Sequence, residues 1–144
     1  MPKLLIPYDG SNSAKRAVRH IASLAAIMKP IDAVLLDVQH PLPLKQRIFD
    51  GRKSDVRELE APLRKAADKR LAAAGKVLGK AGIGHAAHVE FGEPAQWIAD
   101  YAKTHHCDMI VMGTRGLGTV RSLILGSVAT KVLHVATVPV MLIK

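Results

Sequence analysis

The sequence contains few of the residues that define several protein classes. Cys107 is the only cysteine among 144 residues, so no disulfide can form within the chain. No apolar run reaches about 18 residues, so we expect no transmembrane helix. The beginning, MPKLLIPYDG, is a poor signal peptide because Pro7 and Asp9 interrupt its apolar stretch. These absences favour a cytoplasmic protein, and we expect Cys107 to be a buried thiol because it precedes an apolar run.

Aromatic residues are also scarce, whereas positive charge is abundant. The chain has one Trp, two Tyr and two Phe, and its 21 Lys and Arg outnumber 12 Asp and Glu to give a net charge of +9. Such a charge suits anionic partners, including nucleotides, nucleic acids and acidic surfaces. Stacking platforms for single-stranded nucleic acid need aromatic side chains. A basic nucleic-acid-binding module therefore stays open only as a second alternative.

Short apolar runs alternate with helical periodicity along the chain. Strands are predicted at residues 3–7, 32–38, 85–91, 108–112 and 138–144. Helices are predicted from a cap at Ser11 to near Pro30, from a first turn at Pro62 to Gly79 and Gly82, at 93–106, and at 127–136. Residues 39–55, between the second strand and second helix, read as a long loop.

Two of these helices show a clear apolar face. The first face has Ala14, Ala17, Val18, Ile21, Leu24, Ala25 and Met28 at spacings of three and four. The second has Leu63, Ala66, Ala67, Leu71, Ala74 and Leu78. Strands that are apolar throughout are typical of a parallel sheet covered on both sides. The pattern predicts one domain, residues 1–144, with a doubly wound open α/β sheet.

The stretch from Met112 to Ser127 is rich in glycine and contains no acidic residue. It lacks the lysine of a P-loop and the last glycine of a Rossmann fingerprint. What remains is a pattern of Gly113, two residues, Gly116, nine residues, Gly126 and Ser127. The last two stand where a helix begins, so N–H groups there favour phosphate, and Ser127 can cap the helix. Gly113 would let a ligand approach the backbone; the alternative is a surface loop with turn glycines.

Three segments resemble the universal stress protein family. They are IPYDGSNSAKRAV, FGEPAQWI, and MGTRGLGTVRSLILGSVATKVL followed by VPVMLIK. The resemblance covers nearly the whole chain and is weakest at residues 40–59. It implies a five-stranded parallel sheet with two helices on each face. In that family the glycine pattern marks the members that bind ATP, so the resemblance implies ATP, with Mg²⁺ brought in by the nucleotide.

The resemblance also assigns residues to the base and ribose. Asp9 would lie near adenine and ribose, with the backbone of Pro7 and Tyr8 beside it, and Val38 would line the adenine pocket. Tyr8 stands where a smaller residue is common, which would reshape the adenine wall. Asp9 could instead orient a water, which would make the protein a slow ATPase or a self-phosphorylating enzyme.

Further residues come from the glycine loop. The resemblance places Met112 and Gly113 beside the ribose, and Arg115 would add charge. It assigns the phosphates to Gly116, Gly126, Ser127 and Val128. No general base or P-loop lysine accompanies these groups, so the residues favour binding of ATP over its hydrolysis. The implied function is that of an ATP-binding stress-response regulator.

The remaining features suggest no second centre of chemistry. The seven histidines are scattered or, at His105 and His106, adjacent, so we expect no dedicated metal site. The basic run 45–53 reads as a solvated loop, with a lid or an acidic-partner site as alternatives. The last strand is apolar and would be an edge strand, which proteins rarely leave exposed. Because the family often pairs this strand, we expect a homodimer through residues 138–143 and no membrane partner.

Overall fold

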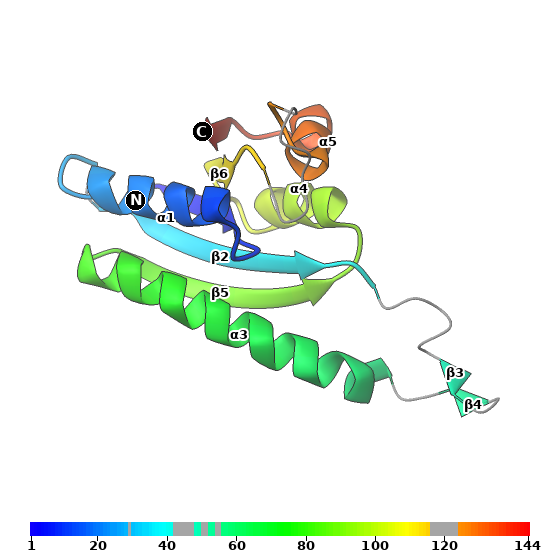
Figure 1. The fold of residues 1–144 in the computed structure, drawn as a ribbon. Helices are drawn as coiled ribbons and strands as arrows, with labels where there is room; N and C mark the ends of the chain where they lie inside the picture. Colours follow the sequence, from blue (N-terminus) through cyan, green and yellow to red (C-terminus); the bar gives the residue numbers. More distant parts are fainter. Residues whose placement is uncertain (29, 42–47, 50–51, 54–55, 116–123) are drawn as a thin grey trace.

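The computed structural model describes residues 1–144 except residues 29, 42–47, 50–51, 54–55 and 116–123 (Figure 1). Strands and helices alternate along the chain, as the hydrophobic pattern predicts. Their bounds are β1 Lys3–Pro7, α1 Asn12–Leu24, β2 Asp32–Gln39, β3 Ile48–Phe49, β4 Arg52–Lys53, α3 Val56–Lys80, β5 Gly84–Phe91, α4 Pro94–Thr104, β6 Met109–Gly113, α5 Ser127–Val135 and β7 Val140–Ile143.

The main sheet has five parallel strands in the order β5-β2-β1-β6-β7. β1 is central, and its Leu5 lies opposite Val34 of β2 and Ile110 of β6. The chain first adds β2 and β5 on one side of β1, then returns to add β6 and β7 on the other. The predicted doubly wound sheet is therefore confirmed, and its strand order reverses between β1 and β6, where such folds bind ligands.

Each face of the sheet is covered by two helices, as the family resemblance implies. Leu4 and Ile6 of β1 pack toward α1 and α3, whereas Leu5 packs toward α4 and α5. This alternation follows from the two-residue repeat of a strand. Cys107, 4% exposed, lies in the core beneath α4, which confirms the buried thiol. Burial raises the pKa of that thiol.

Helix α1 begins as predicted but ends early. The Oγ of Ser11 accepts a hydrogen bond from the Ala14 N–H at 3.1 Å, which confirms the predicted cap. The helix ends at Leu24, and the Leu24 carbonyl then accepts the Met28 N–H at 2.9 Å in a turn. Met28 is 41% exposed, so its predicted place on the buried face is wrong.

Helix α3 is longer than predicted at its beginning. It starts at Val56, so Pro62 lies inside the helix and not in its first turn. Proline removes the N–H that would bond to the Glu58 carbonyl. Good helix formers precede Pro62 and extend the helix beyond the apolar repeat. Leu63 and Ala66 are exposed, so their predicted place on the buried face of the helix is wrong.

The end of α3 follows the predicted glycine signal only in part. Gly79 still belongs to the helix, whereas Gly82 has a φ of +75°, which favours glycine. The Gly82 N–H bonds to the Gly79 carbonyl and the Ile83 N–H to the Leu78 carbonyl, both at 3.0 Å. This pair of bonds is a Schellman motif, and it turns the chain directly into β5.

The predicted long loop at residues 39–55 contains regular structure. β3 and β4 pair antiparallel, with Ile48 opposite Lys53 and Phe49 opposite Arg52. The prediction missed this hairpin because two-residue strands carry too short a pattern to detect. Most of the basic run 45–53 lies outside the described residues, so its solvated, lid and acidic-partner interpretations stay hypotheses.

Candidate functional site

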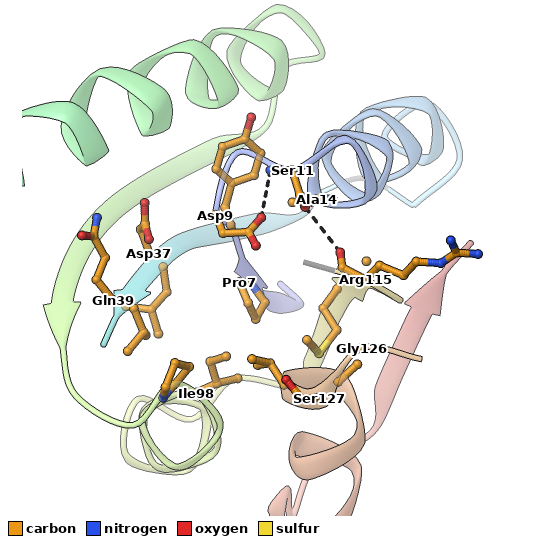
Figure 2. Close-up of a pocket in the computed structure, with 18 of the residues that line it drawn as sticks. Pro7, Asp9, Ser11, Ala14, Asp37, Gln39, Ile98, Arg115, Gly126 and Ser127 are labelled. Atoms are coloured by element: carbon orange, nitrogen blue, oxygen red, sulfur yellow. Dashed lines mark hydrogen bonds between the residues drawn. The ribbon is translucent and has the colours of Figure 1, made fainter. Parts of the chain in front are cut away.

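A pocket of about 420 Å³ opens at the carboxyl ends of β1, β2 and β6 (Figure 2). The beginnings of α1, α4 and α5 complete its walls. This is the crevice at which the strand order reverses, where doubly wound folds bind ligands. Figure 2 shows the Asp9 carboxylate on one wall, and Ser127 and Ile98 on the opposite wall.

The structure brings the sequence-predicted residues together around this pocket. Gly116 lies outside the described residues. The others all line the pocket: Pro7, Tyr8, Asp9, Val38, Met112, Gly113, Arg115, Gly126, Ser127 and Val128. They come from four segments that lie far apart in the sequence, so only the fold places them side by side.

A tight turn positions Asp9 after β1. The Oδ1 atom of Asp9 accepts a hydrogen bond from the Ser11 N–H at 2.9 Å. Gly10 between them has a φ of +82°, which other residues rarely adopt. The turn leads straight into α1, since Ser11 is the residue that caps it. The carboxylate is therefore held at the pocket wall by the backbone that begins the helix.

The start of the glycine loop is attached to the start of α1. The Ser11 Oγ donates to the Arg115 carbonyl at 3.4 Å, and the Arg115 N–H donates to the Ser13 Oγ at 3.2 Å. Figure 2 shows the first of these bonds, and it shows the Arg115 guanidinium pointing away from the residues around the pocket. The predicted charge contribution of Arg115 is therefore not supported by its orientation. Its backbone, in contrast, fixes where the loop begins.

Gly113 has a structural role in addition to the predicted one. A Cβ atom at this position would meet the Ser13 side chain, and it would lie 2.6 Å from the Ser13 carbonyl carbon and 2.7 Å from the oxygen. The glycine is thus required by the close packing of β6 against α1. The sequence does not show which backbone crosses the end of β6, so it suggested only the approach of a ligand, which stays a prediction because Gly113 also lines the pocket.

The beginning of α5 also differs from the prediction. Gly126 is the N-cap residue, and Ser127 is the first residue inside the helix, so the predicted Ser127 cap is wrong. The Gly126 N–H already donates to the Thr114 carbonyl at 2.6 Å. The next three N–H groups, of residues 127–129, have no partner within the helix. These three groups are the ones that an anion could reach.

An ion pair that the sequence analysis missed closes one wall of the pocket. Asp37 of β2 is 2% exposed, and its Oδ2 accepts a hydrogen bond from the Arg70 Nη2 of α3 at 2.8 Å. Burial raises the pKa of the Asp37 carboxyl, although the hydrogen bond and charge of Arg70 act in the opposite direction. An aspartate inside the apolar run DAVLLDV was the signal that could have drawn attention to it.

Tyr8 and Val38 belong to different sides of the sheet. Tyr8 is 5% exposed in the core beneath α1 and α3, and burial, followed by the charge of Asp9, raises the pKa of its hydroxyl. Val38 packs with the α4 and α5 core, on the side that also holds Ile98. The apolar wall of the pocket on the α4 side is therefore built by Val38, Pro94 and Ile98, whereas Tyr8 lines the pocket from the other side of the sheet.

The described part of the chain offers neither a metal cluster nor a membrane-spanning helix. Among the described residues, no three or more His, Cys, Asp or Glu side chains gather so that they could hold a metal ion. In the same part of the chain, every helix is too short or too polar to cross a membrane.

Comparisons with known proteins agree with the fold. The model of the universal stress protein family matches residues 1–144. A universal stress protein of Thermus aquaticus is 34% identical over 148 aligned residues, which cover 98% of this chain and 97% of that protein. The structure of MJ0577 of Methanocaldococcus jannaschii superposes with a TM-score of 0.85 at 27% identity, covering 99% of this chain and 94% of that one.

A second solved structure contains a nucleotide. The universal stress protein of Archaeoglobus fulgidus in complex with dAMP has a TM-score of 0.66 and 26% identity to this chain, and it covers 100% of this chain and 98% of that one. The matching family model, the full-length relatives and the shared fold lead to one conclusion. The chain belongs to the universal stress protein family.

Proposed function

We propose that this protein binds ATP together with Mg²⁺ in the pocket between β1, β2 and β6, and that it acts in the cytoplasm as a nucleotide-controlled regulator of a stress response. The observation that carries the proposal is that ten predicted site residues line one pocket at the point where strand order reverses. The A. fulgidus relative with dAMP supports the same class of ligand.

The chemistry of the walls suits the three parts of a nucleotide. The apolar surface of Val38, Pro94 and Ile98 suits the adenine ring, and Asp9 on the opposite wall can accept hydrogen bonds from ribose hydroxyls. The first turn of α5 offers N–H groups and the positive end of a helix dipole to phosphates. A volume of about 420 Å³ lies within the usual range for small-molecule sites.

Magnesium would enter with the nucleotide. The described residues hold no three-member cluster of metal-ligating side chains, and the buried Asp37 is engaged by Arg70. Mg²⁺ commonly takes its ligands from phosphates and waters with only one or two carboxylates. We therefore assign the metal to the phosphates, with no separate protein cage.

We propose binding and regulation, not turnover, as the principal activity. Hydrolysis or self-phosphorylation needs a base that orients the attacking group. Asp9 is the pocket carboxylate closest to this role by sequence, but its Oδ1 accepts the Ser11 N–H and shapes the turn. This arrangement favours Asp9 as a binding and positioning group.

The proposal is tested by calorimetric titration of the purified protein with ATP and Mg²⁺, with GTP and CTP as controls. We expect saturable binding of ATP and weaker binding of GTP and CTP. All three nucleotides carry the same phosphates, so the difference should come from the apolar wall of Val38, Pro94 and Ile98, which suits the adenine ring. No heat of binding at millimolar ATP, together with no retained nucleotide in native mass spectrometry, would refute the proposal.

We further propose that the protein forms a homodimer through residues 138–143. β7 is the last strand of the sheet, and its four residues remain partly exposed. An edge strand offers unpaired N–H and C=O groups, and pairing with a second copy would satisfy them. Sedimentation at high micromolar concentration should give a dimer. A monomer under these conditions would remove the proposal without affecting the nucleotide site.

A further inference from the structure

The net charge of +9 is concentrated on one side of the molecule. Helices α1 and α3, which cover one face of the sheet, carry ten Lys and Arg but only three Asp and Glu side chains. Helices α4 and α5, which cover the other face, carry two Lys and one Asp. The basic layer, defined here as α1 and α3, thus accounts for most of the excess positive charge.

Nine of the ten cations of the basic layer are exposed, and the exception is Arg70, which binds Asp37. Helix α1 has no acidic residue, and its Lys15 and Arg19 are exposed. On α3, a row of exposed lysines recurs at spacings of four and seven, which places them on one side of the helix. The row consists of Lys65, Lys69, Lys76 and Lys80. None of these side chains lines the nucleotide pocket.

The residue types on this layer narrow the kind of partner. Neither α1 nor α3 contains Phe, Trp or Tyr. Single-stranded nucleic acids are bound largely by aromatic stacking, and protein interfaces are enriched in aromatic anchors. A layer with many cations and no aromatic side chain instead suits a regular array of phosphates, contacted without reading bases.

The length of the layer suits a duplex. Helix α3 has 25 residues and therefore spans roughly 37 Å. The lysine row from Lys65 to Lys80 runs along roughly 22 Å of this helix, which is about two thirds of the 34–36 Å turn of B-form DNA. We propose that the basic layer binds the phosphate backbone of double-stranded DNA without sequence preference. This is a second binding function, and it does not depend on the nucleotide pocket.

The test is fluorescence anisotropy of a labelled duplex of arbitrary sequence, titrated with the protein at several salt concentrations starting from about 50 mM. The parent protein should bind the duplex. The logarithm of its association constant should fall linearly with the logarithm of the salt concentration. Lys15→Gln combined with Lys69→Gln removes one cation from each helix of the layer. This variant should reduce the salt slope by about 1.8, because the slope changes by about 0.9 for each phosphate that the protein no longer neutralises.

A matched variant separates position from charge. Lys103→Gln and Lys131→Gln remove one exposed lysine from each of α4 and α5, so the net charge changes by the same amount. This variant should keep the parent's salt slope, and both variants should bind ATP as the parent does. If neither the parent nor either double variant binds ATP, the nucleotide proposal fails and the DNA result stands.

Three results would overturn the inference. The first is absence of salt-dependent binding by the parent protein. The second is an equal fall in slope for both double variants, which would mean that net charge and not the basic layer matters. The third is tighter binding to polyglutamate, to vesicles of anionic lipid or to single-stranded DNA than to the duplex.

Discussion

The two helix layers are alike in how they pack and different in what they present to the surroundings. Each layer buries alternate residues of the same strands, with Leu4 and Ile6 on one side and Leu5 on the other. Outside, one layer is strongly basic and the other nearly neutral. Single exposed charges change stability by only about 0.5 kcal/mol or less. The fold therefore constrains the inner faces and leaves the outer faces open to selection for function.

The layers also contribute differently to the pocket. The basic layer and the residue that caps α1 supply groups that hold the site together: Ser11 and Ser13 bind the start of the glycine loop, and Arg70 binds Asp37. The neutral layer supplies surface that a ligand would touch, including Ile98 and Ser127. This division of roles predicts that changes in the two layers affect stability and binding in different proportions.

The largest expected effects come from equal truncations in the two cores. Leu71 of α3 and Ile98 of α4 are each 2% exposed, and truncation to Ala should cost about 2–5 kcal/mol of unfolding free energy in either case. Only Ile98 lines the pocket, so only Ile98→Ala should also weaken ATP binding. Urea unfolding and calorimetry check the two parts. Equal losses of ATP affinity in Leu71→Ala and Ile98→Ala would show that the two helix layers do not differ in their contribution to the pocket.

The next effect concerns the buried ion pair. Arg70→Ala leaves the Asp37 carboxylate without its partner, which typically costs about 3 kcal/mol; because Arg70 is 37% exposed, water should reduce that cost. The Asp37 pKa is already raised by burial, and loss of Arg70 should raise it further. The stability deficit at neutral pH should therefore shrink as the pH falls and Asp37 binds a proton.

Urea unfolding of Arg70→Ala at several pH values, compared with the parent, gives the measurement. The control is Asp37→Asn combined with Arg70→Ala, which has no carboxyl to titrate. That variant should show no such pH dependence relative to the parent above the acidic range. A deficit of Arg70→Ala that stays constant from neutral to acidic pH would mean that the pair contributes packing only.

The third effect is on affinity and involves the turn between β1 and α1. Asp9→Ala should weaken ATP binding by about 1.5–3 kcal/mol, the usual contribution of hydrogen bonds to a charged group, or roughly tenfold or more. Asp9→Asn keeps an oxygen that can accept the Ser11 N–H, so it separates the turn from the ligand contact. Calorimetry is the readout, and unchanged affinity of the alanine variant would take Asp9 out of the site.

The smallest effect is expected at Ser127. Because Gly126 and not Ser127 caps α5, Ser127→Ala should change the unfolding free energy by about 0.5 kcal/mol or less. ATP affinity should fall only by the contribution of one hydroxyl, since the backbone N–H groups remain. A stability loss of about 1 kcal/mol or more in thermal unfolding would show that the hydroxyl acts as a cap after all.

The hydrophobic pattern predicted most elements, because apolar spacing directly reflects which residues are buried. It placed the five strands of the sheet and the Ser11 cap. It was wrong where local signals compete. Pro62 is a good first residue of a helix, but favourable residues before it extend α3, and the hairpin of β3 and β4 is too short to show a period.

The residues of the candidate site were predictable through the glycine pattern and the segments that resemble a family, and the pocket gathers those that the structure describes. Their partners were not. The bond from Arg70 to Asp37 joins residues 33 apart, and those from Ser11 and Ser13 to Arg115 join residues more than 100 apart. Contacts over such distances in sequence depend on strand order, which no local pattern encodes.

The sequence by itself determined the alternation of strands and helices, the identity of the buried faces and the charge of +9. The net charge is a sum over the residues, and the strands, helices and buried faces follow from the spacing of apolar residues along the chain. Only the tertiary structure decided that β1 lies at the centre, that Gly113 must pass close to Ser13, and that α1 and α3 share one layer. The physical reason is that close packing brings together residues that are distant in the chain. The sequence gives the number of charges, but only the packing decides which of them lie on the same surface.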